Sequence, residues 1–491
     1  MERLYNLFKG FINQAAALVH KFPIASFFII AFYIVYVYIV FKDKKKESGK
    51  HIRGARMIAP GNFFRDIFFG KSANNKSLMI GDIELPIASE DKQMFSFGRP
   101  GSGKTTIYNQ IILKLIERKE KGIIYDEKFD YIPNFYDSKV DLILNIADER
   151  TLKWSLINEI DDKADLFSLA ESLIPEAVGA EQHWNDTARG IFTAVTREFI
   201  LNGKTKNQEL FKALSQKAED IYNFLVEQNA PEAVHLANPK NASDVLSTLM
   251  RYVNWLDNAE DGDFKIREWM NDKSKRFIFV ANNPKIKKIQ RPLLSLFIDL
   301  FIKNYLSLNE SRERRFYFIL DELGTLGKMS SIADLLTQGR SKGLRTFIGT
   351  QDVGQIDKPY GRESRSTLIN ACSNYVLLCQ NEIENAKFAS DLVGTSEIWQ
   401  SSHSSNDVGA DGSQQDMPNL KPLILPSEFQ SMDNLTAYVR VLKNWRFTKI
   451  KIIDLPIKND GFILNDSFSF NKYKTSENRA DRAEVKNNGI S

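Results

Sequence analysis

The sequence predicts an α/β protein with a mainly parallel sheet, an inserted all-helical domain and one N-terminal transmembrane helix. Apolar, strand-like runs alternate with helical stretches along most of the chain, which is typical of a parallel sheet covered on both faces. Residues 160–263 have helical spacing and no convincing strand, which indicates a helical domain inserted between two strands. Residues 22–41 carry no charge, which indicates a helix that spans a membrane.

The composition is that of a folded protein of more than one domain. The chain has 491 residues, of which 43% are hydrophobic and 26% are charged, so it is too long for a single core. Wholesale disorder and collagen-like structure are excluded. Two cysteines exclude a disulfide framework and a four-thiolate zinc site, and the five histidines show no metal-ligand spacing. We expect Cys372 and Cys379 to be small buried side chains.

The uncharged segment at residues 22–41 is long enough to cross a hydrocarbon core of about 30 Å at about 1.5 Å per residue. It ends directly in lysines, whereas a cleaved signal peptide would end at small residues, and a buried core helix is seldom apolar all round. More Lys and Arg residues follow the segment than precede it, so we expect the long C-terminal part to be cytoplasmic. The amphipathic residues 1–20 are too polar for a second span and are expected at the membrane interface.

A glycine-rich loop follows the strand-like run Gln93–Phe97 and precedes a helical pattern. It matches the phosphate-loop pattern G-x4-G-K-[ST] in the strand–loop–helix setting that this pattern requires. Its glycines allow backbone N–H groups to turn toward phosphate oxygens, and the helix N-terminus adds its dipole. Lys104 is expected to reach the β- and γ-phosphates of ATP, and the Thr105 hydroxyl to bind Mg²⁺. The expected nucleotide contacts are Gly98, Arg99, Pro100, Gly101, Ser102, Gly103, Lys104, Thr105 and Thr106.

Two adjacent acids end the apolar run Arg315–Leu320. We expect this strand to neighbour the strand of the phosphate loop, so that Asp321 holds Mg²⁺ through water. Glu322 would then polarise the attacking water as a general base, a role that fits a motor ATPase better than a kinase. The alternative is a strand that ends in two solvated acids.

Two further candidates lie around the next predicted strand, Gly343–Thr350. Gln351 at its end can contact the γ-phosphate and report its loss, and a surface glutamine is the alternative. Arg340 and Arg345 flank the turn before this strand. Either could be an arginine finger for the nucleotide of a neighbouring subunit, with Arg340 favoured, or a plain surface charge.

The remaining patterns give the organisation of the chain. Asp126 ends a predicted strand on the side where such sheets bind ligands, and it either contacts ligand or caps a helix. Residues 401–418 are polar and rich in Gly and Ser, which predicts a mobile loop. Further strands are predicted at residues 122–126, 142–146, 276–281, 375–379, 435–441 and 445–453. The predicted domains are a membrane anchor (1–50), a nucleotide-binding domain in two pieces (51–159 and 264–466), the helical domain (160–263) and a disordered tail (467–491).

The densest basic segment of the chain follows the helical domain and contains no acid. Clustered cations suit a phosphate backbone, and a solvated loop is the alternative. We expect salt-sensitive DNA binding that is weakened by replacing Lys287 and Lys288. The segment comprises Lys273, Lys275, Arg276, Lys285, Lys287, Lys288 and Arg291.

Together these stretches resemble the coupling proteins of type IV secretion systems, the TraD/TrwB-like conjugative ATPases. The resemblance extends roughly from Ile52 to Asp454. The acids followed by ELGTLGK and the later Gly349–Gln351 stretch, in that order, are more specific than the phosphate loop alone. The stretches that carry it are His51–Arg56, the phosphate loop, the helical insertion, Asp321–Lys328, Gly339–Gly343, Gly349–Gln351 and Pro426–Glu428.

The resemblance implies a RecA-like P-loop motor that binds ATP and Mg²⁺ and forms homo-hexamers at the bacterial inner membrane. It implies nucleotide bound between subunits, with an arginine finger supplied by a neighbour. Such proteins bring relaxase-bound single-stranded DNA, recognised without regard to sequence, or protein substrates to the secretion channel. Many family members have two membrane helices where only one is found here.

Two other functions compete with this interpretation. One is an FtsK-like chromosome-partitioning translocase, which would usually have several membrane spans and a DNA-reading winged-helix tail. The other is a nucleotide-gated cargo receptor with little turnover, against which the intact Lys104, Thr105, Asp321 and Glu322 argue.

Overall fold

The computed structural model describes residues 51–57, 77–177, 179, 181–403, 414–441, 444–465 and 468. They fall into two units, one of residues 57–392 with 424–491 and one of residues 1–56 with 393–423. The expected membrane anchor at residues 22–41, the amphipathic residues 1–20 and nearly all of the expected tail lie outside the described residues. Among the helices that are described, none is long and apolar enough to cross a membrane.

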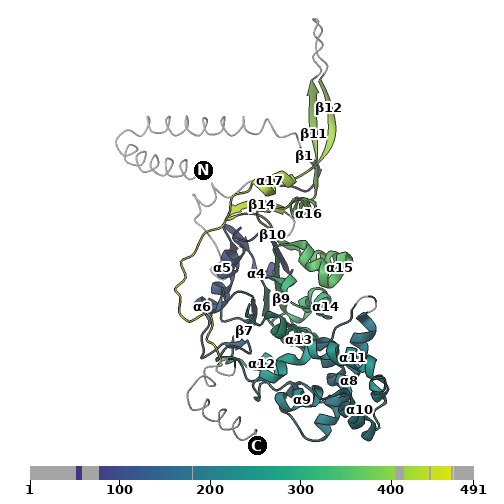
Figure 1. Cartoon of the computed structure of the whole chain (residues 1–491). Coiled ribbons are helices and arrows are strands. Elements are labelled where there is room, and N and C mark those ends of the chain that lie inside the picture. The colour runs from purple at the N-terminus through teal and green to yellow at the C-terminus, as the bar shows by residue number, and fades with distance from the viewer. Residues whose placement is uncertain are drawn as a thin grey trace, which may run out of the picture. The chain divides into compact units, whose positions relative to one another are not determined.

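The larger unit is built on a nine-stranded sheet in the order β14-β13-β10-β4-β9-β8-β5-β7-β6 (Figure 1). From β10 to β6 all neighbouring strands pair in parallel, while β13 and β14 are antiparallel. The predicted mainly parallel α/β fold is therefore confirmed. The strands are β4 (Met94–Phe97), β5 (Lys121–Asp126), β6 (Leu142–Leu144), β7 (Phe277–Ala281), β8 (Phe316–Leu320), β9 (Leu344–Thr350), β10 (Asn374–Leu377), β13 (Thr436–Val441) and β14 (Asn444–Lys449).

The strands β7 and β8 are apolar and buried throughout because helices cover both faces of the sheet (Figure 1). In β8, successive side chains point to opposite faces of the sheet. Phe316 and Phe318 stack on Phe301 of α13 (Lys287–Leu306), with ring centroids 5.0 and 5.7 Å away. Tyr317 and Ile319 belong instead to the cluster that contains the apolar side of α5 (Lys104–Glu117). An alternating polar strand could not be placed here, since either face would bury unpaired polar groups.

The inserted stretch is helical, as the sequence predicts. Its helices are α7 (Lys163–Leu173), α8 (Glu181–Leu201), α9 (Asn207–Leu214), α10 (Ala218–Glu227) and α11 (Pro239–Val253). Residues 207–225 form two helices, since the chain leaves the helical conformation between α9 and α10. Asp162 accepts the Asp165 N–H at 2.8 Å and Asn238 accepts the Lys240 N–H at 3.0 Å, so α7 and α11 begin at N-cap side chains.

Further helices complete the described part of this unit. The kink in α15 lies at Gly361, whose φ of 78° is outside the helical region. These helices are α4 (Ile87–Glu90), α6 (Ile132–Phe135), α12 (Ile266–Asn271), α14 (Ile332–Gln338), α15 (Val353–Asn370), α16 (Ile383–Val393) and α17 (Pro426–Ser431); a small hairpin joins β2 (Leu78–Ile80) to β3 (Ile83–Leu85).

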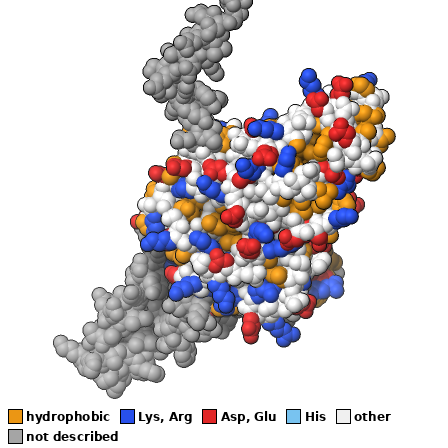
Figure 2. Space-filling view, turned by 90° about the horizontal axis from the view of Figure 1, so that it is seen from below, with side chains coloured by type: hydrophobic (Ala, Val, Ile, Leu, Met, Phe, Trp, Pro, Cys, Tyr) orange, Lys and Arg blue, Asp and Glu red, His pale blue; other side chains and the backbone are white. Residues whose placement is uncertain are grey.

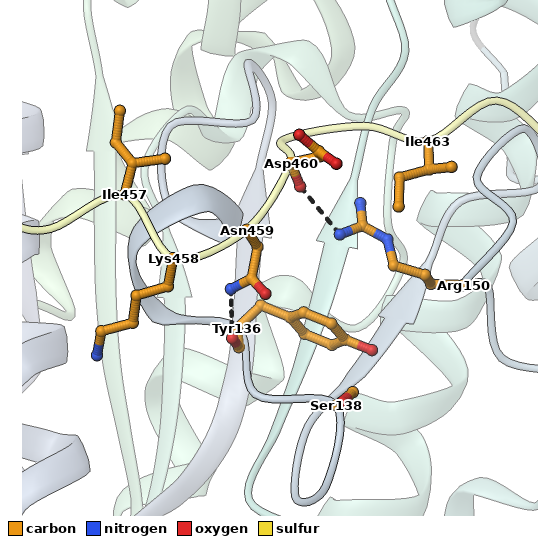
Figure 3. A pocket seen from close by; sticks show the side chains of 8 residues that line it. All are labelled: Tyr136, Ser138, Arg150, Ile457, Lys458, Asn459, Asp460 and Ile463. Atoms are coloured by element: carbon orange, nitrogen blue, oxygen red, sulfur yellow. Dashed lines mark hydrogen bonds between the residues drawn. The ribbon is translucent and has the colours of Figure 1, made fainter.

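After β14, at one edge of the sheet, the chain returns to β6 at the opposite edge. Figure 3 shows how this returning segment is held: Asn459 Nδ2 donates to the Tyr136 carbonyl at 2.6 Å, and Arg150 Nη1 donates to the Asp460 carbonyl at 2.9 Å. The rings of Phe129 and Phe462 lie 5.5 Å apart. The segment therefore braces the loop that follows β5.

The smaller unit contains a three-stranded antiparallel sheet in the order β1-β11-β12. Its strands are β1 (His51–Gly54), β11 (Thr395–His403) and β12 (Gln414–Pro422). The predicted mobile loop at residues 401–418 is thus wrong at both ends, where the chain forms the two long strands of a hairpin. Pairing between β11 and β12 supplies the regular structure that the polar composition did not reveal.

Candidate nucleotide-binding site

Except for Arg340, the predicted site residues converge at the carboxyl ends of β4, β9 and β8. The phosphate loop joins β4 to α5, Gln351 follows β9, and the two acids follow β8. The expectation that the two key strands are neighbours is wrong, because β9 pairs with β4 on one side and β8 on the other. Gln351 therefore ends the strand that lies between the loop and the acids.

The loop itself is held in a conformation that glycine permits. Gly103 has a φ of 116°, in the left-handed region that L side chains rarely adopt. A side chain at Gly98 would place its Cβ 2.6 Å from Ser102 Oγ and 2.7 Å from Leu378 Cβ. The Arg99 N–H donates to the Cys379 carbonyl at 3.0 Å, which ties the loop to the end of β10.

The rim of the loop is tied to the C-terminal strands. Arg99 Nη2 donates to Asn434 Oδ1 at 2.7 Å, and Leu435 N–H donates to the Ser102 carbonyl at 2.9 Å. The Arg99 Nε also lies 3.2 Å from Cys379 Sγ. Both cysteines are buried, as the sequence predicts.

A lysine and two acids form the charged centre of the site. Lys104 Nζ lies 3.1 Å from Glu322 Oε2 and 3.4 Å from Asp321 Oδ1, and it donates to the Asp321 carbonyl at 2.9 Å. Lys104 is 5% exposed and Glu322 is 3% exposed, so their charges interact with little screening. The structure thus brings Lys104 to two acids that lie more than two hundred positions later in the sequence. We call these three the acid–lysine centre.

Glu322 is held by several donors. Its Oε1 accepts hydrogen bonds from Thr350 Oγ1 at 3.1 Å and from the Gln351 N–H at 3.3 Å. Burial raises the pKa of Glu322, while the neighbouring Lys104 acts in the opposite direction. A carboxylate with a raised pKa is a better proton acceptor once it is ionised, which is the property that a general base needs.

Asp321 has one oxygen engaged and one without a hydrogen bond. Its Oδ2 accepts from the Tyr131 hydroxyl at 2.6 Å. Its Oδ1 is buried without a hydrogen-bond partner, although the Lys104 ammonium lies 3.4 Å away. An orphaned carboxylate oxygen beside a phosphate loop fits a water-mediated contact to Mg²⁺. Within the described residues no group of three or more His, Cys, Asp or Glu could hold a metal, so a cation here would need phosphate oxygens.

Tyr131 is a site residue that the sequence analysis missed, and Asp126 is the reason for its position. The Asp126 carboxylate accepts backbone N–H groups from Asp130, Tyr131 and Ile132 at 2.8, 3.0 and 3.0 Å. Of the two roles left open for Asp126, the structure shows the local one, in which it fixes the loop at the start of α6. Burial raises the pKa of Asp126 to about 7, although the three donors act the other way.

The two candidate arginines lie at the other edge of the sheet, Arg340 in the helical turn before β9 and Arg345 as the second residue of β9. Arg345 is 7% exposed, and its Nη1 donates to the Gly343 carbonyl at 2.9 Å, so it is bound within its own chain. Arg340 Nε lies 3.1 Å from Asp91 Oδ2, and its side chain is 55% exposed. Of the two, only Arg340 presents a guanidinium that could reach a neighbouring subunit.

Comparison with known proteins now adds to this geometry. The family model for the type IV secretion-system coupling protein DNA-binding domain matches residues 77–453. The chain is 26% identical to the coupling protein TraD of Escherichia coli K12 over 411 residues, which are 80% of this chain and 57% of TraD. It is 24% identical to the type IV secretion system-coupling protein VirD4 of Bartonella henselae over 293 residues, which are 54% of this chain and 45% of VirD4. The chain thus spans about half the length of these relatives.

Solved structures agree with the sequence relatives. The bacterial conjugative coupling protein TrwBdeltaN70 superposes with a TM-score of 0.76 at 25% identity, over 85% of this chain and 97% of that one. Plasmid coupling protein TrwB in complex with ADP and Mg²⁺ superposes with a TM-score of 0.74, also at 25% identity, over 85% of this chain and 98% of that one.

Proposed function

The chain belongs to the type IV secretion-system coupling protein family, and we propose on that premise that it is a membrane-anchored ATPase. It would couple relaxase-bound single-stranded DNA, or a protein substrate, to a type IV secretion channel and drive transfer by ATP hydrolysis. The observation that carries the proposal is the acid–lysine centre, which lies at the mouth of a phosphate loop with one Asp321 oxygen unsatisfied. The TrwB structures with ADP and Mg²⁺, and with a non-hydrolysable ATP analogue, support nucleotide as the ligand.

Residues of the phosphate loop would bind the nucleotide. The backbone N–H groups of Gly101, Gly103, Lys104, Thr105 and Thr106 would surround the phosphates, and the N-terminus of α5 would stabilise their charge. Thr105 and Asp321 would hold Mg²⁺, which neutralises charge on the β- and γ-phosphates when it is bound.

Lys104 changes partners in this scheme. In the structure its ammonium pairs with Glu322, and triphosphate binding would draw it toward the phosphate oxygens. Glu322 would then lose its nearest cation, and its pKa would rise further. The freed carboxylate accepts a proton from the water that attacks the γ-phosphorus, and the bond to the ADP oxygen breaks as the new one forms. Gln351, at the end of the intervening strand, contacts the γ-phosphate and reports its loss.

Assembly and location complete the proposal. The chain would form homo-hexamers at the bacterial inner membrane, held by a single helix at residues 22–41, with the RecA-like motor in the cytoplasm. Nucleotide would lie between subunits, and Arg340 of one subunit would serve the site of the next. The helical domain at residues 160–263 would face the incoming substrate.

ATP turnover by the detergent-solubilised full chain, with and without single-stranded DNA, tests this function. We expect DNA to stimulate turnover, and Glu322→Gln to abolish it with and without DNA. A wild-type rate that is very low and indifferent to DNA would support the nucleotide-gated receptor instead. Stimulation by double-stranded DNA alone would support a chromosome-partitioning translocase.

A further inference from the structure

A cavity of about 530 Å³ separates the inserted helices from the helices that cover the sheet. The chain between α7 and α8, together with α11, lines one side. The other side is lined by α13, α15 and the segment Gly327–Lys328, which follows the two acids of the site. This volume lies within the usual range of ligand pockets, about 300–1,000 Å³.

Five cations line this cavity, from both sides: Arg251, Lys288, Arg291, Lys328 and Lys358. We call it the cationic cleft. Among the described residues, none of the five forms an ion pair within 4.0 Å. Glu176 and Glu181 also line the cleft, but among the described residues neither carboxylate forms an ion pair with any of the five cations; Lys328 Nζ donates to the Glu176 carbonyl at 3.3 Å. Five converging positive charges without counterions repel one another and raise the free energy of the empty cleft.

Several cations close to the cleft or in another cavity are paired with acids. Lys287, the residue before Lys288 on α13, pairs with Glu127 at 2.6 Å, and Lys303 on the same helix lies 3.7 Å from Asp299. On the face seen in Figure 2, Lys and Arg side chains are interspersed with Asp and Glu. The second cavity, drawn in Figure 3, has its Arg150 paired with Asp148 at 2.7 Å. The cleft differs from these places because five cations without an ion pair gather around one cavity.

The residues of the basic segment identified from the sequence lie in different surroundings: some line the cleft, some are paired with acids, and some are exposed elsewhere. Lys288 and Arg291 line the cleft. Arg276 pairs with Asp141 at 2.6 Å, and Lys287 pairs with Glu127, so their charges are already compensated. Lys273 and Lys285 are exposed and do not line the cleft. The segment is therefore not one continuous patch, and the expectation that Lys287 and Lys288 act alike is replaced by a distinction between them.

The floor of the cleft is connected to the catalytic acids by one short segment. Arg291 Nη2 donates to the Leu326 carbonyl at 2.7 Å, and Ser295 Oγ accepts the Gly327 N–H at 2.8 Å. The Tyr360 hydroxyl lies 3.4 Å from the Gly327 carbonyl. Residues 323–329 begin directly after Glu322, and Thr325 Oγ1 donates to the Glu322 carbonyl at 2.9 Å. A ligand that moves Arg291 or Lys328 therefore acts on the chain that positions Glu322.

We propose that the cationic cleft binds the phosphodiester backbone of single-stranded DNA, and that its occupation stimulates hydrolysis at the acid–lysine centre through residues 323–329. This proposal rests on the proposed function. Guanidinium and ammonium groups from several elements suit a chain of phosphates, since each neutralised phosphate releases a condensed counterion. The family model that matches residues 77–453 describes a DNA-binding domain, which supports DNA over an acidic peptide.

The test compares two double variants of the full detergent-solubilised chain that lose the same charge. Lys288→Gln with Lys358→Gln removes two cations of the cleft, whereas Lys273→Gln with Lys285→Gln removes two exposed cations elsewhere. The probe is a fluorescent oligodeoxythymidylate, titrated over a range of salt concentrations. For single strands each lost phosphate contact lowers the slope of log K against log salt by about 0.7, so the cleft variant should lose about 1.4. At 0.1 M salt this corresponds to about 25-fold weaker binding, relative to a 1 M reference.

Turnover supplies the second measurement. The ratio of ATP turnover with oligodeoxythymidylate to turnover without it should fall to near one in the cleft variant and stay at the wild-type value in the control variant. Equal slopes and ratios in the two variants would overturn the proposal. Loss of polyglutamate binding in the cleft variant, with oligodeoxythymidylate binding intact, would overturn it in favour of an acidic peptide. If DNA does not change ATP turnover of the wild-type chain, the proposed function itself is wrong. If DNA stimulates turnover equally in the wild type and in the cleft variant, only the assignment of the cleft as the DNA site is wrong.

Discussion

Two buried ionic clusters lie at opposite edges of the same sheet, and they differ in how fully their charges are matched. At the amino edge, Glu90 accepts from both Arg118 Nη1 and Nη2 at 2.8 and 2.9 Å, and it also accepts from the Tyr317 hydroxyl. Glu120 lies 3.0 Å from Arg118 and 3.0 Å from Arg315. We call this set the arginine cluster. It contains two carboxylates, which Arg118 and Arg315 join by bidentate and bridging contacts, and Arg345 Nε lies 3.9 Å from Glu90 Oε2.

At the carboxyl edge, the acid–lysine centre has two carboxylates for one ammonium, and Asp321 Oδ1 has no hydrogen bond. Burying an uncompensated charge is costly, so a fold retains one where something else completes it. At the amino edge each carboxylate has a guanidinium partner, and these charges stabilise the fold. Under the proposed function, a nucleotide and Mg²⁺ would complete the carboxyl edge. Four single variants and one double variant sharpen or break this contrast.

Replacement of Lys104 should have the largest effect on turnover. Lys104→Ala removes the ammonium that pairs with both acids and that would reach the β- and γ-phosphates. We expect ATP turnover to fall by at least about 10²–10³-fold, together with a loss of affinity for a fluorescent ADP. Turnover at the wild-type rate would mean that the acid–lysine centre is an ordinary structural ion pair, like the arginine cluster.

Glu322→Gln should come next, and it separates binding from chemistry. The amide keeps the shape of the side chain but cannot accept a proton, so turnover should fall by about 10²–10⁴-fold. Affinity for ADP should stay the same or increase, because Lys104 is no longer held by a carboxylate. Parallel losses of binding and turnover would show instead that Glu322 maintains the site rather than acting as the base.

Tyr131→Phe should have a smaller effect that depends on Mg²⁺. The substitution removes only the hydroxyl that donates to Asp321 Oδ2 at 2.6 Å. Groups that orient a metal-binding side chain typically contribute about 10–100-fold in metal affinity. We therefore expect the Mg²⁺ concentration for half-maximal turnover to rise about tenfold or more, with turnover restored at saturating Mg²⁺. A lower maximal rate with an unchanged Mg²⁺ requirement would contradict a positioning role for Tyr131.

Tyr131 also marks the limit of what the sequence could predict. Lys104, Asp321 and Glu322 were identified because each follows a local pattern, a glycine-rich turn or an apolar strand that ends in acids. Tyr131 contacts a residue 190 positions away, and its loop is fixed by Asp126 through backbone N–H groups. No periodic pattern in the sequence indicates such a long-range contact. The position of β9 between β4 and β8 was missed for the same reason, since strand order is set by long-range packing.

The hairpin of the smaller unit shows the converse error. Polarity and small residues at 401–418 resembled a loop, yet residues 395–403 and 414–422 pair along nine positions. Backbone hydrogen bonds between two strands do not require an apolar pattern on either strand. The larger sheet was predictable because its strands are buried on both faces, and burial on both faces requires continuous apolar runs.

The arginine cluster should have the smallest effect on turnover, although it should have a large effect on stability. Arg118→Met removes the guanidinium that binds Glu90 and leaves that fully buried carboxylate with little compensation. Breaking a buried pair from one side costs about 3–5 kcal/mol in the free energy of unfolding. We expect a lower thermal midpoint but unchanged turnover per folded molecule, measured below the transition. This is the opposite of the result expected for Lys104→Ala.

The double variant Arg118→Met with Glu90→Gln distinguishes charge compensation from simple packing. If the unpaired Glu90 charge causes the loss, then removing that charge should restore part of the stability lost in Arg118→Met. A double variant that is less stable than Arg118→Met would indicate that the shape and hydrogen bonds of Glu90 matter more than its charge. An effect of either variant on turnover per folded molecule would break the contrast between the two edges. The arginine cluster at the amino edge would then influence the chemistry at the carboxyl edge.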